Sequence, residues 1–285
     1  MGKTVFLNGT YLDESEAKVS IFDRGYVFGD GAYEVTTVLD GKLVDSPRHQ
    51  WRLEKSLAAI DIPLPLPWEE IEEMQRELVR RNGLDQGLVY FQITRGVADR
   101  RFSYNPGLVP TLSAFTQTLS LDPDPLAQSG VKVVTCPDLR WKRRDIKSIS
   151  LLSQVMAKQV AKQAGAFEAF MVEDGLITEG SSTSAFIITD TGQLIVRPSG
   201  GTDILPGLTC FATLELVEQG DLVRVERAFS PQELYTAREA FLTSATNFIM
   251  PIVEADGQRI GGGTPGAMTL KLRQRLIEAA RANLS

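Results

Sequence analysis

The first 120 residues are dominated by short runs in which apolar and polar side chains alternate. Near the N-terminus these runs are "TVFLNG" and "TYLDE", and each is followed by turn-forming or charged residues. A longer stretch, "AYEVTTVLDGKLVD", has Asp40 and Gly41 between its two halves. Alternation with period two is typical of a half-buried strand, and Asp-Gly favours the tight turn of a hairpin. We therefore predict that the chain begins as antiparallel sheet.

The next two segments have a helical period instead. Apolar residues recur every three or four positions from Pro47 onward, and again from Pro67 to about Gly83, where Ile71, Met74 and Leu78 share one face. Proline is favoured in the first turn of a helix and glycine just past its end, so both segments are predicted helices. The runs "LVYFQITRG" and "PTLSAFTQT" then predict two buried strands, which completes an α+β unit.

Residues 120–130, "SLDPDPLAQSG", combine proline, aspartate and glycine without any period. This composition is typical of an exposed connection between domains. We therefore predict a small N-terminal domain at 1–119, an interdomain loop at 120–130 and a larger domain at 131–285. In the larger domain we expect helices at about 149–163, after Gly207 and from about 267, and strands at "VKVVTC", "EAFMVED", "SAFIITD", "LVRVER" and "AFLTSAT".

Composition narrows the classes of protein that remain. The chain has 285 residues, 43% of them hydrophobic, which is typical of a folded globular protein. A net charge of -6 argues against nucleic acid or an anionic membrane as the main partner. The two cysteines, Cys136 and Cys210, lack the spacing of a zinc site and indicate buried thiols in a reducing compartment. With neither a signal peptide nor a long apolar run in the sequence, we expect a cytoplasmic protein without a bound metal.

The stretch "RWKRRDIKS" places Lys147 after a dense group of cations, Arg140, Lys142, Arg143 and Arg144. A lysine attacks a carbonyl carbon only as the neutral amine, and nearby positive charge favours that form. The stretch could serve a covalent catalyst, but taken alone it fits better with a solvated basic strand.

Two further stretches are candidates for binding an anionic cofactor. In "ITEGSSTSAF", Glu179 stands in an apolar setting between predicted strands, where a carboxylate can either cap a turn or pair with the ring nitrogen of pyridoxal phosphate. In "LPGLTC", Gly207 and Thr209 lie at the start of a predicted helix. Such a start can bind a phosphate, although simple N-capping by Thr209 is the more common use.

Considered together, several motifs resemble those of the fold type IV pyridoxal-phosphate transaminases, and in particular the D-amino-acid aminotransferases. The motifs appear in the family's order and cover nearly the whole chain: "DRGYVFGDGAYE", "HQWRL", "YFQITRG", "DLRWKRRDIKS", "TEGSSTSAF", "ILPGLT" and "FLTSATNFIMPI". The resemblance implies a homodimer of two-domain subunits, each with a small N-terminal α/β sandwich and a larger C-terminal pseudo-barrel. Pyridoxal 5'-phosphate is expected between the two domains.

The resemblance also assigns roles to residues. Lys147 is expected to form the Schiff base with the cofactor and to move the substrate proton, and Glu179 to pair with the pyridine nitrogen. The cofactor phosphate is expected to contact Arg52, Leu208, Thr209, Ser244 and Thr246. The substrate is expected to contact Tyr33, Arg100, Arg101, Ser182 and Thr183.

Two positions depart from the family's pattern. An Arg-x-His pair usually holds the substrate carboxylate, but "DRRFSY" has Phe102 where the histidine is expected, which leaves Arg100 with Arg101 as a possible helper. Near the phosphate, Ala245 stands where the family favours threonine. The function expected from the resemblance is transamination between a D-amino acid and a 2-oxo acid. The alternatives are an L-branched-chain transaminase, an (R)-amine transaminase, an aminodeoxychorismate lyase and, from another class, a non-catalytic anion-binding protein.

Overall fold

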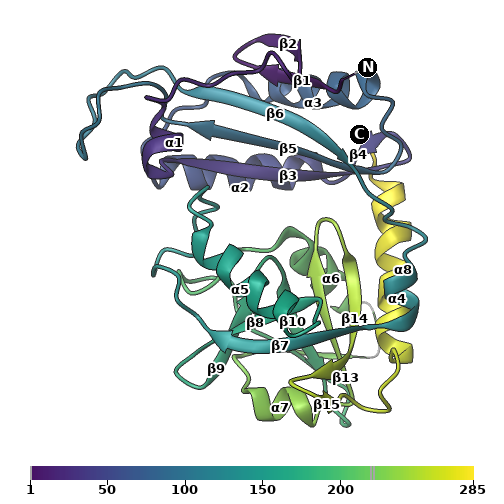
Figure 1. Ribbon diagram of the computed structural model, residues 1–285. Coiled ribbons are helices and arrows are strands. Elements are labelled where there is room, and N and C mark those ends of the chain that lie inside the picture. The colour runs from purple at the N-terminus through teal and green to yellow at the C-terminus, as the bar shows by residue number, and fades with distance from the viewer. Residues whose placement is uncertain (1, 219, 221) are drawn as a thin grey trace. The chain divides into compact units, whose positions relative to one another are not determined.

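The computed structural model describes residues 2–218, 220 and 222–285, and these residues form two compact units (Figure 1). Unit 1 contains the chain up to Leu121 together with Ile146–Ser150 and Ala280–Ser285. Unit 2 contains Asp122–Asp145 and Leu151–Ala279. The short segment that carries Lys147 therefore belongs to the N-terminal unit, although it follows the first stretch of unit 2 in the sequence.

Unit 1 is built on a six-stranded sheet in the order β2-β1-β6-β5-β3-β4. Every paired strand in it is antiparallel. The strands are β1 (Thr4–Leu7), β2 (Thr10–Asp13), β3 (Gly31–Leu39), β4 (Lys42–Leu43), β5 (Gly87–Thr94) and β6 (Thr111–Thr118). The predicted hairpin at Asp40 and Gly41 is confirmed, because both residues have positive φ angles between β3 and β4.

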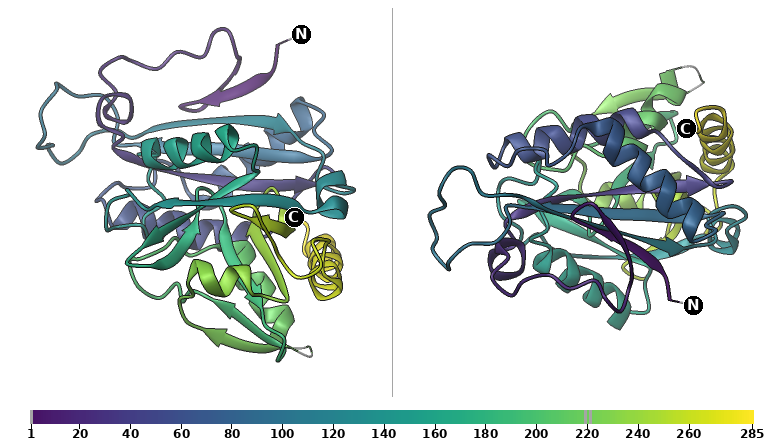
Figure 2. Two further views of the ribbon diagram at one scale, coloured as in Figure 1. Left: turned by 60° about the horizontal axis from the view of Figure 1, so that its bottom comes forward. Right: turned by 90° about the horizontal axis from the view of Figure 1, so that it is seen from above.

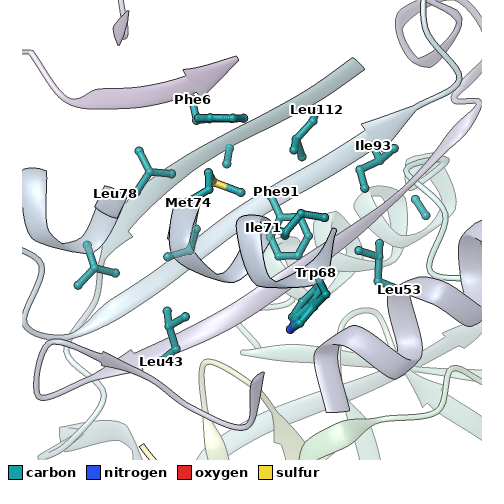
Figure 3. Close-up of a cluster of buried hydrophobic side chains, with 14 of the residues drawn as sticks. Phe6, Leu43, Leu53, Trp68, Ile71, Met74, Leu78, Phe91, Ile93 and Leu112 are labelled. Carbon is teal, nitrogen blue, oxygen red and sulfur yellow. The ribbon is translucent and has the colours of Figure 1, made fainter. Parts of the chain in front are cut away.

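Two helices, α2 (Ser46–Ala58) and α3 (Trp68–Arg81), cover one face of this sheet (Figures 1 and 2). The predicted apolar face of α3 is buried, with Ile71, Met74 and Leu78 packed among sheet residues such as Phe91 (Figure 3). Acidic residues in the first turn of α3 and basic ones in its last turn suit the helix dipole. This layer makes β3 a rigid support for the residues that it carries.

Sequence periodicity did not predict the short helix α1 (Arg24–Phe28). Its start is capped by the Asp23 side chain, which accepts from the Gly25 N–H, and it ends at Gly29 with φ 68°. Five residues are too few for a visible helical period. The helix lies just before β3, and its side chains contact the loop between β5 and β6, which projects from the sheet (Figures 1 and 2).

Unit 2 is built on a nine-stranded mixed sheet in the order β12-β11-β10-β13-β14-β7-β8-β9, with β15 paired to β14. The pairs β14/β7, β7/β8 and β11/β12 are parallel, and the others are antiparallel. The strands are β7 (Val131–Pro137), β8 (Glu168–Glu173), β9 (Leu176–Gly180), β10 (Ser184–Ile188), β11 (Gln193–Val196), β12 (Val223–Glu226), β13 (Glu239–Ser244), β14 (Phe248–Ala255) and β15 (Gln258–Arg259).

The helices that begin in unit 2 are α4 (Pro125–Ser129), α5 (Leu152–Gln163), α6 (Leu208–Glu218), α7 (Pro231–Tyr235) and α8 (Ala267–Ala282). Helix α5 packs on β7 and β8, and α6 packs on β12 and β13. The core is formed by large apolar residues of the central strands, such as Phe170, Leu242 and Met250. The mixed α/β fold with its curled second sheet confirms the predicted fold class.

The predicted long helices and most predicted strands are present within a few residues of their expected bounds. Residues 120–130 differ from a plain loop because α4 lies within them, with the Asp124 side chain capping its start at the Leu126 N–H. The first passage from unit 1 to unit 2, at Leu121 and Asp122, falls inside this predicted connection. The domain bounds at 119 and 131 stay a prediction.

Candidate active site

Lys147 is positioned by strand-like pairing of its segment with β3. The Tyr33 N–H donates to the Lys147 carbonyl at 3.0 Å, and the Lys147 N–H donates to Ser56 Oγ on α2 at 3.1 Å. The Ile149 N–H donates to the Gly31 carbonyl at 3.1 Å. With its backbone held on both sides of the residue, Lys147 has a fixed Cα position from which its side chain extends.

The amine of Lys147 lies over the ring of Tyr33, with Nζ 4.1 Å from the ring centroid. Tyr33 in turn stacks on Tyr90 with ring centroids 5.5 Å apart, and Tyr90 stacks on Phe115 at 4.9 Å. Burial, with the Tyr33 phenol adding to it, raises the pKa of Tyr90. The structure thus places two of the predicted site residues, Lys147 and Tyr33, side by side at one end of a row of aromatic rings.

Arg52 lies in a buried ionic cluster that the sequence reasoning missed. Its Nε and Nη2 donate to the two oxygens of Glu34 at 2.7 and 2.8 Å, and His49 Nδ1 lies 2.6 Å from Glu34 Oε2. Burial alone would raise the pKa of Glu34, but Arg52 and His49 outweigh it and hold this pKa well below its usual range. Two of the three guanidinium nitrogens of Arg52 are therefore engaged by a protein carboxylate.

The predicted carboxylate-binding residues of unit 1 lie on the projecting loop between β5 and β6. Arg100 and Arg101 are both exposed, and so is Phe102. The loop backbone is held by the buried Arg24, whose Nη1 donates to the Arg101 carbonyl at 2.6 Å. The two arginines are thus presented on an anchored loop.

In unit 2, Glu179 is the second-last residue of β9 and a buried carboxylate with one engaged oxygen. Its Oε1 accepts from Arg140 Nη1 and, at 3.2 Å, from the Leu205 N–H. Among residues 2–218, 220 and 222–285, Oε2 has no hydrogen-bond donor. Burial raises the pKa of Glu179, and Arg140 offsets only part of this effect. A cation or N–H donor placed at Oε2 would stabilise the ionised form.

The cations that precede Lys147 are each paired with a carboxylate of unit 2. Arg140 binds Asp138, Arg143 binds Asp145, and Lys142 and Arg144 both bind Glu173. The sequence suggested that these charges act on Lys147 as a group. Their ion pairs compensate most of this positive charge, and the expected effect on Lys147 stays a prediction. Arg140 also binds Glu179.

A second buried carboxylate, Glu168 at the start of β8, holds the turn that follows Glu179. Ser181 Oγ donates to its Oε1, and Ser182 and Thr183 donate to its Oε2 at 3.3 and 3.4 Å. The hydroxyls of the two predicted substrate residues therefore face a protein acceptor. The sequence reasoning missed Glu168, because the three hydroxyl residues that it binds lie 13, 14 and 15 residues further along the chain.

Helix α6 begins at Leu208, as the sequence predicted. N–H groups in a first helical turn have no acceptor within the helix, so those of Leu208 and Thr209 can bind an anion. A Cβ at Gly207 would lie 2.7 Å from Ser184 Oγ, so glycine allows the chain to approach β10 closely here. The approach brings the helix start to Ser184, whose register partner on β13 is Thr243.

The turn that follows Thr243 carries the other two predicted phosphate residues. Ser244 Oγ and Thr246 Oγ1 lie 3.5 Å apart, and Asn247 donates to Ser244 Oγ at 2.8 Å. Since β10 and β13 are neighbouring strands, the structure gathers Ser244, Thr246 and the start of α6 at one end of the unit 2 sheet. Glu179 joins them through its hydrogen bond from Leu205, three residues before α6.

The chain has relatives among known proteins. Residues 31–255 match the family model described as amino-transferase class IV. The chain is 41% identical over 272 residues to a D-alanine aminotransferase of Bacillus licheniformis, with 95% of each chain covered. It is 38% identical over 271 residues to a D-alanine aminotransferase of Staphylococcus aureus (strain MSSA476), again with 95% of each covered.

The fold is also found among solved structures. A branched-chain amino acid aminotransferase from Escherichia coli superposes with a TM-score of 0.87 at 21% identity, over 100% of this chain and 96% of that one. This likeness shows the fold type alone. With the family match over most of its length and relatives near 40% identity, the chain is an enzyme that belongs to the class IV aminotransferases.

Proposed function

We propose that this aminotransferase binds pyridoxal 5'-phosphate and exchanges an amino group between a D-amino acid and a 2-oxo acid. The observation that carries the proposal is Glu179, a buried carboxylate with one oxygen fixed by Arg140 and the other without a donor in the described chain. The D-alanine aminotransferases at 38 to 41% identity support the D-amino acid as substrate.

The residues of unit 2 fit this cofactor at both of its ends. A pyridine nitrogen that carries a proton is a donor suited to Glu179 Oε2, and its positive charge would offset the burial that raises the pKa of that carboxyl. A phosphate is suited to the free N–H groups at the start of α6 and to the hydroxyls of Thr209, Ser244 and Thr246. When bound, pyridoxal phosphate supplies an electron-withdrawing ring that stabilises negative charge at the substrate Cα.

Lys147 has the proposed catalytic role. Its amine would hold the cofactor covalently, and the same amine, when not bonded to it, would be the group that moves the proton of the substrate Cα. The bonds from Tyr33 and to Ser56 fix its backbone, and the Tyr33 ring beneath Nζ limits where the amine can go. Tyr33 is therefore proposed to orient the amine and to line the substrate side.

Arg52 and Leu208 are also proposed to bind the phosphate. Leu208 contributes its backbone N–H at the start of α6. Arg52 contributes less than an unpaired arginine would, because Glu34 binds two of its nitrogens. Ala245 lacks the hydroxyl that the family favours, and the hydroxyls of Ser244 and Thr246 lie on both sides of it in the turn.

For the substrate, we propose that Arg100 binds the α-carboxylate with Arg101 as a helper, since a guanidinium offers two parallel donors and a permanent charge. Ser182 and Thr183 are proposed to line the substrate site from the turn held by Glu168. This arrangement favours acids over simple amines.

Stereochemistry is tested by half-reactions. The purified enzyme, loaded with pyridoxal phosphate, is mixed with the D- and L-forms of alanine, glutamate and leucine, and conversion is followed in the visible spectrum. We expect the D-form to react faster in each pair. A faster reaction with L-leucine would instead establish the branched-chain alternative.

We also propose that the enzyme is a homodimer. Unit 1 exposes large apolar side chains in two segments that a monomer would leave in water, including Ile21 at 70%, Tyr26 at 78% and Val109 at 81%. Exposed apolar surface of this kind is typical of an interface between chains. Light scattering after gel filtration should give twice the chain mass of 31.3 kDa, and Tyr26→Asp should lower it.

A cytoplasmic location is proposed from the thiols. Cys136 and Cys210 are both free thiols, a form that a reducing compartment favours. Cys210 is buried as predicted, whereas Cys136 is only half-buried. In the described part of the chain, no helix is long and apolar enough to cross a membrane.

A further inference from the structure

The guanidinium group of Arg100 lies beside two aromatic rings. Its Cζ is 5.5 Å from the ring centroid of Phe28 and 5.7 Å from that of Phe102. The two rings contact each other, with centroids 5.6 Å apart and planes inclined by 42°. The two distances from Arg100 Cζ to the rings are within the range at which a cation is attracted by an aromatic ring. We call Phe28 and Phe102 the aromatic platform.

One half of the platform is fixed by α1. Phe28 is the last residue of this capped helix, and its ring also lies 4.7 Å from Cζ of the buried Arg24. Arg24 is itself held by Asp30, with Nε 2.8 Å from Oδ2. Since Asp30 also binds Arg95 on both of its oxygens, the helix and the end of β5 form one ionic network beneath the ring.

The other half of the platform is fixed through the backbone. Arg24 Nη1 and Nη2 donate to the carbonyls of Arg101 and Phe102 at 2.6 and 3.4 Å. Further along the loop, the ring of Tyr104 lies 3.6 Å from Cζ of Arg95. The loop that carries Arg100 is therefore anchored immediately after this residue, although its side chains are exposed.

From this geometry we propose that Phe28 and Phe102 are positioning residues that hold the Arg100 guanidinium in place for the substrate carboxylate. Phe102, which stands where the family's pattern has a histidine, thus has a function of its own. Its ring face attracts the guanidinium without using an N–H group, so all five N–H donors of Arg100 remain for the substrate. The inference rests on the proposed role of Arg100.

Equilibrium binding of a carboxylate without an amino group tests this without turnover. Propionate is titrated into the enzyme loaded with pyridoxal phosphate, and its Kd is read from the visible spectrum, with propionamide as the uncharged control. The Phe28→Leu and Phe102→Leu variants keep apolar bulk but lose a ring, Phe102→Trp keeps a ring, and Arg100→Ala removes the guanidinium.

A cation–π contact at an exposed site corresponds to about a twofold to fivefold change in affinity. We expect each leucine variant to raise the Kd of propionate by this factor, and Phe102→Trp to keep it near the wild-type value. Propionamide binding should not change. In an Arg100→Ala background, Phe102→Leu should have no further effect, because the two residues act as a pair.

The two ways to fail are distinguishable. If Arg100→Ala raises the Kd but Phe102→Leu leaves it unchanged, the aromatic platform is rejected and the role of Arg100 stands. An unchanged Kd in Arg100→Ala itself would reject both, because the carboxylate would then be bound elsewhere. Equal weakening of propionate and propionamide in the leucine variants would also overturn the proposal, since it would show a loss of shape rather than of charge recognition.

Discussion

Glu34 in unit 1 and Glu179 in unit 2 are both buried glutamates, but their pKa values are displaced in opposite directions. Both oxygens of Glu34 are bound by Arg52, with His49 as a further partner, and its pKa is held below the usual range. Glu179 is bound at one oxygen, and burial raises its pKa. The difference shows that partners, not burial, decide whether a buried carboxylate is structural or available to a ligand.

The same contrast holds for the two regions. Unit 1 carries groups that the protein itself fixes, namely the Lys147 backbone beside β3 and Arg24 beneath the loop. Unit 2 carries groups that remain partly unsatisfied, namely Glu179 Oε2 and the start of α6, in the described chain. We assign the pyridine nitrogen to Glu179 Oε2 and the phosphate to the start of α6, whereas the covalent bond is assigned to Lys147 of unit 1.

The largest effect is expected from Glu179→Gln on the rate. A neutral amide cannot keep the pyridine nitrogen protonated, and each pKa unit lost there is about 1.4 kcal/mol of carbanion stabilisation. The variant should retain cofactor and lose roughly a hundredfold or more in kcat. Single-turnover rates with D-alanine measure this, and a rate near that of the wild type would exclude the role.

Next comes Glu34→Gln, which should act on stability. It leaves the buried Arg52 without its charged partner, and breaking a buried ion pair costs about 3–5 kcal/mol. Urea unfolding of the cofactor-free protein should show this loss. The matched control is Glu54→Gln, which removes an exposed carboxylate on the helix that carries Arg52 and should change the free energy of unfolding by less than about 0.5 kcal/mol.

A smaller effect concerns the pH dependence of the cofactor-free protein. The lowered pKa of Glu34 gives stability that is present above its unfolded pKa and is lost as the pH falls through the folded one. The raised pKa of Glu179 gives stability that is present below its unfolded pKa and is lost as the pH rises through the folded one. Near neutral pH, the Glu179 carboxyl should therefore no longer stabilise the cofactor-free protein. In thermal melts from pH 3 to pH 8, the Tm of Glu179→Gln near neutral pH should be at least as high as that of the wild type. A lower Tm there would mean that Glu179 is as fully paired as Glu34.

The smallest effect is expected from Glu168, whose partners in the turn after Glu179 are three hydroxyl groups. Glu168→Gln keeps an acceptor but weakens three hydrogen bonds in the turn at Ser181–Thr183, each worth about 1 kcal/mol. We expect a several-fold rise in KM with a smaller change in kcat. Lys158→Met removes the exposed cation 3.5 Å from Glu168, together with its contacts to Phe167, and leaves the three hydroxyl partners in place. It is the control that should leave KM unchanged.

Sequence reasoning could single out a candidate site residue where the residues next to it in the chain form a distinctive motif. Lys147 lies in a distinctive basic stretch, and Glu179 and Thr209 lie beside glycines at the ends of regular elements. Glu34 was missed because its role in the ionic cluster depends on contacts from Arg52 and His49, which lie on another element, α2. An inward strand position occupied by a charge, as at Glu34 between Ala32 and Thr36, is the feature that could have revealed it.

Other contacts have no trace in the sequence. Arg24 reaches the backbone carbonyls of Arg101 and Phe102, and a carbonyl is present at every residue. The carboxylates that compensate Arg140 and Arg144 come partly from β9 and β8, so the basic stretch looks more cationic in the sequence than it is in the fold. Periodicity gives elements and faces, whereas these pairings depend on how the strands of each unit are ordered.

The central claim is that Lys147 is the residue that holds the cofactor. Reduction of the loaded enzyme with borohydride, followed by peptide mapping, fixes the cofactor to its lysine and locates it directly. We predict a pyridoxyl label on the peptide that contains Lys147, and none in Lys147→Ala. A label on Lys158 or Lys162 of α5 would contradict the assignment of the catalytic residue.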